Sequence, residues 1–284
     1  MTTTSIRNSI LQKPWRLWFT QIGSVIRLES RRNLFRWRSS WVYFLAFAPT
    51  CIIVLHALFD RNHGRMEEDT MILAGIFQFY YLRLGIFFGC LGIFTRLIRG
   101  EMTERSLHYY FLSPVRREVL LVGKFLAGVI RATVLFGTAV FASFFFMYLP
   151  YGAAGQQYVF DGPGQSQLLS YLGITLLASI GYGALFLLFS MLMKNPIPGA
   201  LILMGWEFIS AILPAFLQRF SVTSYLRPLL PVTIPAEGIF ALLTVTTDPV
   251  PAWMATLGVL ILAVIVLSLS CIRVRSLEIS YSTD

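Results

Sequence analysis

The chain has 284 residues, of which 56% are hydrophobic and only 13% are charged. Soluble domains typically carry about a quarter charged residues, so this composition excludes an ordinary soluble domain, and the mean hydropathy of +0.68 agrees. Several apolar runs approach the roughly 20 residues that a helix needs to cross a bilayer. A membrane β-barrel would instead alternate apolar and polar residues over segments of about ten. We therefore predict an all-α polytopic membrane protein.

The net charge of +9 comes from 23 Lys and Arg residues against 14 Asp and Glu residues. An excess of arginine is ordinary in the cytoplasmic connections of a membrane protein, so we expect no nucleic-acid partner. The three cysteines, Cys51, Cys90 and Cys271, lie within apolar runs and lack the spacing of metal ligands. We expect neither a disulfide nor a metal site.

The segment before the first apolar run has the pattern of a helix that lies in the membrane interface. Its apolar residues recur at spacings of three and four, whereas Arg16, Arg27 and Arg31 fall largely off that stripe. We predict that residues 1–40 form a cytoplasmic N-terminus containing this amphipathic helix. The apolar stripe consists of Trp15, Trp18, Phe19, Ile22, Val25 and Ile26.

Length and hydropathy predict six transmembrane helices within a membrane domain at 41–271. The spans are 41–59, 71–94, 119–148, 168–193, 197–217 and 253–271. Five prolines interrupt the stretch 218–252, and prolines at this density break a lipid-facing helix. We predict short outer-face or re-entrant helices there, before the last span, and a cytoplasmic tail at 272–284.

The distribution of basic residues predicts the orientation. Seventeen Lys and Arg residues fall in connections on one side of the membrane, and four fall on the other. Since basic residues are retained on the cytoplasmic side, we place both termini in the cytoplasm. We predict a multi-pass protein of the cell (cytoplasmic) membrane, in which the first span serves as the targeting signal.

Three ionisable side chains fall within predicted spans: Arg83, Arg131 and Glu207. Such residues are costly in a bilayer and are candidates for function. Arg83 and Glu207 both fall near the middle of their spans, so an ion pair between them is geometrically possible. Two interpretations stay open. The charges hold helices together or reach the interface through their long side chains, or they line a translocation path.

The connection between the second and third spans predicts an amphipathic helix at 101–112. Its apolar residues recur at helical spacing, and Glu101 and Glu104 fall in its first turn, where negative charge complements the helix N-terminus. Ser113-Pro114 ends the helix, because the residue before proline is disfavoured in the α region. A surface helix joined closely to two spans can transmit a push from a soluble partner.

This connection resembles the corresponding loop of the ABC-2 family, the integral-membrane permeases of many ABC exporters. Members commonly show an acidic start, a Leu-x-x-Tyr-Leu-Leu type of helix, then Pro-Val-x-Arg and Gly-Lys before the third span. The six spans and the N-terminal interfacial helix also match the family's plan. The residues that carry the resemblance are Glu101, Glu104, Leu107, Tyr110, Leu112, Pro114, Val115, Arg117, Gly123 and Lys124.

The resemblance implies that the helix at 101–112 is a coupling helix, with Glu101, Glu104, Leu107 and Tyr110 in contact with a separate ABC ATPase subunit. It also implies a dimeric core in which the chain pairs with a second copy or a related permease. Arg83, Arg131 and Glu207 are then the candidates for the translocation path.

The chain has no GxxxxGK[ST] phosphate loop and no HExxH or GxSxG signature. We therefore predict no catalytic residue and no cofactor in this chain, with ATP and Mg²⁺ on the partner ATPase. The predicted function is the permease subunit of an ATP-driven exporter. Two alternatives stay open: a secondary transporter, and a non-transporting membrane scaffold or assembly protein.

Overall fold

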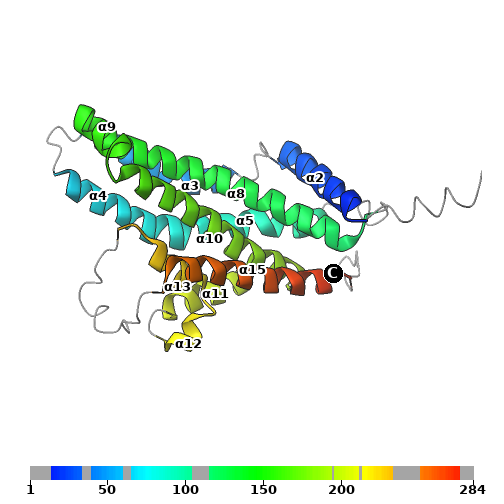
Figure 1. Ribbon diagram of the computed structural model, residues 1–284. Coiled ribbons are helices and arrows are strands. Elements are labelled where there is room, and N and C mark those ends of the chain that lie inside the picture. Colours follow the sequence, from blue (N-terminus) through cyan, green and yellow to red (C-terminus); the bar gives the residue numbers. More distant parts are fainter. Residues whose placement is uncertain are drawn as a thin grey trace, which may run out of the picture.

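A computed structural model describes residues 14–33, 40–59, 65–103, 115–193, 195–210, 213–232 and 250–275. Helices make up 91% of these residues, and no strand occurs among them. The long helices run roughly alongside one another in one bundle, with the chain reversing between neighbours (Figure 1). The prediction of an all-α polytopic membrane protein is confirmed at this level.

Within the described ranges, five helical segments are long and apolar enough to cross a membrane. The first is α3 (Ser40–Phe59), and the last is α15 (Ala252–Arg275). The second is continuous from Met66 to Gly100 and the third from Arg117 to Phe160. The second segment comprises α4 (Met66–Gly75), η2 (Ile76–Gly85), α5 (Ile86–Thr95) and η3 (Arg96–Gly100). The third comprises α8 (Arg117–Tyr148), η4 (Leu149–Tyr151) and α9 (Gly152–Phe160). The fourth is the single helix α10 (Gly164–Leu192).

The segment predicted as a span at 197–217 differs from the other five. Its helix, α11 (Ile197–Ile209), has 13 residues, or about 20 Å at 1.5 Å per residue, which is shorter than the roughly 30 Å of a hydrocarbon core. Pro214 follows, and the chain continues in short pieces. These are α12 (Ala215–Gln218), α13 (Val222–Leu226) and η5 (Arg227–Leu229), and Figure 1 shows α12 beyond α11, away from the long helices.

The short helices α13 and η5 fall in the stretch where we predicted non-crossing helices, and α13 packs against α10 and α15. Residues 233–249 of that stretch lie outside the described part of the chain. So do 104–114, which hold most of the predicted helix at 101–112. Of that helix, the structure describes only α6 (Glu101–Thr103).

The centre of the bundle is formed by α8 and α10, which pack against each other and against α5 and α15. Phe94 of α5 is fully buried and fits between glycines of the two helices. A Cβ on Gly183 of α10 would lie 2.4 Å from its Cζ, and one on Gly128 of α8 would lie 2.7 Å from its Cε1. The glycines thus create the space that the ring fills.

A triangle of buried hydroxyl groups joins the first three spans. The oxygens of Thr50, Tyr81 and Ser143 lie 2.9 to 3.1 Å from one another, and Thr50 also donates to the carbonyl oxygen of Ala139. Hydroxyl groups inside a membrane domain need such partners, because neither lipid nor water satisfies them there. The triangle therefore holds α3, η2 and α8 in register.

The helix before the first span, α2 (Pro14–Asn33), packs against α8, and Figure 1 shows it beside the end of α8 where that helix begins. We call this end of the bundle the loop end. Gly123 of α8 makes the contact close, since a Cβ there would lie 2.9 Å from Cβ of Val25. The helix predicted to lie in the interface is thus docked on a span along part of its surface.

Substituting Gly183 by alanine should destabilise the bundle, because the added methyl group would overlap the enclosed Phe94 ring. Overpacking of this kind costs about 1–3 kcal/mol. We expect the apparent melting temperature of the detergent-solubilised protein to fall by several degrees.

The matched control is Gly173→Ala on the same helix, where an added Cβ has no atom within 4 Å and alanine raises helix propensity. Gly173→Ala should leave the melting temperature unchanged or slightly raised. Equal melting temperatures for the two variants would contradict the packing described for Phe94.

Candidate functional site

Three charged side chains are buried together at the loop end of the bundle. The ammonium group of Lys124, on α8, donates to Oε1 of Glu29 at 2.5 Å and lies 2.7 Å from Oε1 of Glu101. Lys124 is 1% exposed, and both glutamates are buried. Burying charges is costly unless they are paired in good geometry. We call Glu29, Glu101 and Lys124 the charge cluster; it joins α2, α6 and α8.

The first residues of α8 make further links at the same end. The guanidinium of Arg116 lies 5.0 Å from the ring centroid of Trp18 on α2. Arg117 donates from Nη1 to the carbonyl oxygen of Arg275 at 3.1 Å, one of the carbonyl groups that a helix C-terminus leaves unsatisfied. Glu118 in turn pairs with the side chain of Arg275. The start of α8 is therefore fixed to both α2 and α15.

The charge cluster and these links lie on both sides of the segment 104–114. Glu101 stands just before it, and Arg116 to Lys124 stand just after it. Because Glu101 and Lys124 are paired, the end of the second span and the start of the third are held together. We call these two helix ends the roots of the segment 104–114. A displacement of one root is therefore passed to the other.

A second group of polar residues lies midway along the bundle. A recess there is lined by Arg83, Phe87, Tyr182, Met204, Glu207, Phe208 and Thr223, which come from the second span, α10, α11 and α13. We call it the Arg83 recess. Its empty space of about 240 Å³ includes volume that is open to the surroundings, so the recess is a shallow, partly open depression and not an enclosed ligand cavity.

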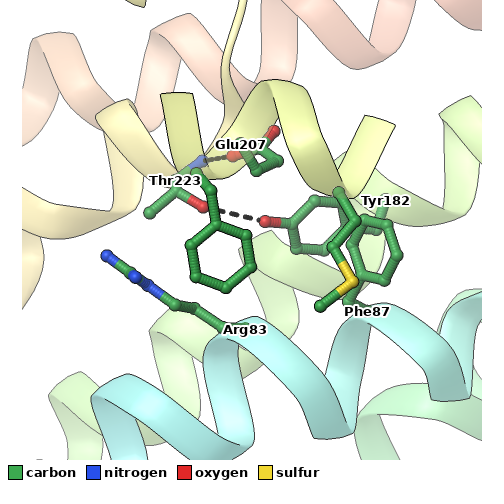
Figure 2. Close-up of a pocket in the computed structure, with 7 residues that line it drawn as sticks. Arg83, Phe87, Tyr182, Glu207 and Thr223 are labelled. Atoms are coloured by element: carbon green, nitrogen blue, oxygen red, sulfur yellow. Dashed lines mark hydrogen bonds between the residues drawn. The ribbon is translucent and has the colours of Figure 1, made fainter. Parts of the chain in front are cut away.

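Glu207 is occupied by bonds to its own neighbours in the fold. Its carboxylate accepts hydrogen bonds from the backbone N–H groups of Val222 and Thr223, at 2.9 and 3.0 Å, and from the hydroxyl of Ser221 at 2.7 Å. These N–H groups begin α13, where no helical partner exists for them. Glu207, on α11, thus caps α13, and Figure 2 shows its bond to Thr223.

Arg83 lies between aromatic rings. Its guanidinium carbon is 5.5 Å from the ring centroid of Phe79 and 5.1 Å from that of Phe208. No ion pair joins it to Glu207, although both residues are described and both line the recess; Figure 2 shows the two groups apart. The ion pair that the sequence allowed is therefore not formed.

Arg83 also stands in an unusual stretch of helix. The ten residues Ile76–Gly85 form the π-helix η2, and a second π-helix, η3, directly precedes Glu101. Segments of π-helix inside α-helices are rare and occur often at functional sites. Both candidate sites therefore adjoin a change of helical winding in the second span.

Two of the remaining predicted site residues, Glu101 and Arg131, lie within the described part of the chain. Glu101, predicted to contact an ATPase, is 6% exposed and belongs to the charge cluster. Arg131 lies on α8, does not line the Arg83 recess, and has a buried Nε without a hydrogen bond to any described residue. Glu104, Leu107 and Tyr110 fall outside the described residues.

Comparison with protein-family models and with curated proteins finds no match for this chain. The resemblance to ABC-2 permeases therefore stays a prediction.

Sequence reasoning missed the partner of Lys124. Glu29 is the single acidic residue in α2, a helix that also carries several arginines. A lone carboxylate in a basic helix is a signal that could have drawn attention to it. The pair Gly123-Lys124 entered only as part of a motif, whereas the structure gives each residue a packing partner on α2.

Replacing Lys124 by methionine should strongly destabilise the protein, because two buried carboxylates lose their shared cation. Removing one partner of a buried ion pair costs about 3–5 kcal/mol, which corresponds to roughly 10 °C in the melting temperature of a protein of this size. The measurement is thermal unfolding in detergent.

Arg65→Met is the control for this substitution, since Arg65 is exposed at the start of α4 and its loss should change the melting temperature by a degree or less. Glu101→Gln should have an intermediate effect, because Lys124 keeps Glu29. A Lys124→Met protein as stable as the wild type would show that the cluster is not formed.

Glu207→Gln should loosen α13, since a glutamine has one acceptor oxygen where the carboxylate has two and would present an N–H group to a donor. Leaving a buried donor unsatisfied costs about 1–3 kcal/mol. Hydrogen–deuterium exchange of residues 222–226 should become about tenfold faster or more.

Asp161→Asn provides the matched control, because Asp161 is exposed beyond the end of α9 and is far along the chain from α13. Exchange at 222–226 should be unaffected in that variant. Unchanged exchange in Glu207→Gln would refute the capping role.

Proposed function

We propose that this chain is the membrane-spanning permease subunit of an ABC-2 type exporter, energised by a separate ATPase that docks on residues 101–112. The observation that supports the proposal is the charge cluster. It joins the two roots of that segment to each other and to α2, through Lys124 at 2.5 and 2.7 Å from its two carboxylates.

The mechanism follows from the rigidity of this junction. When nucleotide binding closes the ATPases, they push on the segment between Glu101 and Arg116. Because Glu101 is paired with Lys124, the second and third spans respond together, and α2 follows through Glu29. The spans then change between inward-open and outward-open arrangements, each favoured by its own contacts.

In this proposal Glu101 does not belong to the surface that contacts the ATPase. Glu101 serves as the buried root that transmits motion, since its side chain is almost fully covered. Glu104, Leu107 and Tyr110 remain the residues proposed to contact the ATPase. ATP and Mg²⁺ bind to that partner, which lies in the cytoplasm with both termini of this chain, and a second permease copy or a related permease completes the core.

The proposal predicts that the solubilised protein co-purifies with an ATPase that carries a phosphate-binding loop. Leu107→Glu should reduce the recovered ATPase more than tenfold, because a buried charge at the centre of an apolar contact costs at least about 2 kcal/mol. The measurement is affinity purification from native membranes, followed by mass spectrometry of the captured subunits.

Phe160→Glu is the control of equal chemistry. Phe160 is 70% exposed on α9, at the opposite end of the third helical segment from Arg117. This variant should recover as much ATPase as the wild type. Absence of any ATPase from the wild-type preparation, or equal recovery with Leu107→Glu, would contradict the proposal.

A further inference from the structure

The Arg83 recess holds a cation that forms no direct ion pair with any described residue, although the charge of Glu207 acts on it from a distance. Arg83 has neither a hydrogen bond nor an ion pair to any residue that the structure describes, and its guanidinium lies against the faces of Phe79 and Phe208. Aromatic faces attract a cation, but they leave its N–H donors without acceptors. These donors remain available to a ligand.

The one carboxylate in the recess does not supply the missing acceptor. Both oxygens of Glu207 accept bonds from Ser221 and from the first N–H groups of α13. Those donors offset the negative charge of Glu207 locally. Glu207 therefore repels an anion bound at Arg83 less strongly than a carboxylate without hydrogen bonds would. Glu207 is held in place by this cap and cannot reach Arg83 without releasing α13.

A second cation stands near the first. Arg227, on η5, interacts with Arg83 as a like charge, and no ion-pair partner for it occurs among the described residues. Two arginines that repel each other within an apolar segment are both stabilised when an anion lies between or beside them. The charge of this region therefore favours an anionic ligand over a cationic one.

The recess also has an apolar entrance. Phe79 is 52% exposed and Phe208 is 46% exposed, and neighbouring residues of α11 are exposed and apolar as well, among them Leu201 and Ile202. In a membrane protein such a surface faces hydrocarbon or another membrane helix. A molecule that arrives with a hydrocarbon chain can lay it along α11 while its charged group reaches Arg83.

We propose that the Arg83 recess binds the anionic phosphate or carboxylate group of an amphipathic molecule from the bilayer, with Arg83 as the binding residue and Arg227 as a supporting charge. Arginine suits this role because its planar group offers paired donors to the two oxygens of such a group. The tyrosine–threonine pair Tyr182–Thr223, joined at 3.0 Å, closes the inner side of the recess. The site is independent of the proposed function, since binding requires neither an ATPase nor transport.

The test is lipid binding to the purified, delipidated full chain, measured by native mass spectrometry. Dioleoyl phosphatidylglycerol and dioleoyl phosphatidylcholine are compared because they share their hydrocarbon chains and differ in net charge. We expect the wild type to prefer the anionic lipid about tenfold, as one charge-assisted contact allows. In Arg83→Gln this preference should disappear, and in Arg83→Lys it should be reduced.

One control separates the recess from general electrostatics. Arg219→Gln removes an exposed arginine near the recess in sequence, and this variant should keep the tenfold preference. Size-exclusion chromatography and a melting curve without lipid establish that each variant is folded and has the oligomeric state of the wild type.

Inorganic phosphate supplies the second arm, which identifies the source of the anion. Stabilisation by phosphatidylglycerol but not by millimolar phosphate would support a ligand from the bilayer, and stabilisation by phosphate that Arg83→Gln abolishes would support a ligand from the aqueous phase. Equal binding of the two lipids to the wild type, without a phosphate effect, would overturn the site. An Arg83→Gln protein that keeps the full preference for the anionic lipid would also overturn the site. The same holds if Arg83→Gln changes only the oligomeric state of the protein.

Discussion

The ammonium group of Lys124 is covered almost completely by protein, and the arrangement of the loop end depends on the two carboxylates that face it. A buried ion pair contributes little net stability compared with apolar residues of the same shape, but it is specific, because any other arrangement leaves a charge unpaired. Here that specificity connects three elements that are distant in sequence. It therefore ties α2, α6 and α8 to one another at the loop end.

The geometry around Lys124 explains why a glycine and a lysine stand together at the start of α8. Gly123 lets the backbone of α2 approach closely at Val25, and this approach brings Glu29 within reach of the ammonium group. A side chain at 123 would move α2 outward and lengthen the ion pair. The two residues thus serve one contact, with the glycine providing the space and the lysine providing the charge.

The charged groups of the Arg83 recess have other partners than those of the charge cluster, because they do not pair with each other. Glu207 accepts hydrogen bonds from the start of α13 and from Ser221, whereas the guanidinium of Arg83 lies against aromatic rings without a direct ion pair to any described residue. A carboxylate on α11 accepts the first N–H groups of the short helix α13, and Phe208, one residue further along α11, lies over Arg83. The short helices α11 and α13 thus supply four of the seven residues that line the recess.

Much of the helical plan could be predicted from the sequence, because hydrophobicity is a property of each residue and adds up along a run. Five of the predicted spans coincide with apolar helices of sufficient length. The segment 197–217 could not be placed this way, since its helix ends at Ile209 and the chain beyond it is held by bonds from Glu207 to residues 14 to 16 positions further along. The burial of Glu101 was likewise invisible, because it requires a partner 23 residues further along the chain.

The pairing of Glu29 with Lys124 also has a consequence for how the protein is made. The two residues are 95 positions apart, so at about 5–20 residues per second the ribosome needs roughly 5 to 20 seconds to supply the lysine after the glutamate. Throughout that interval α2 has no helix on which to dock, and its tryptophans and arginines suit it to the lipid surface. The interfacial pattern in the sequence of α2 thus suits its position at the lipid surface during synthesis. The charge cluster fixes its final position against α8.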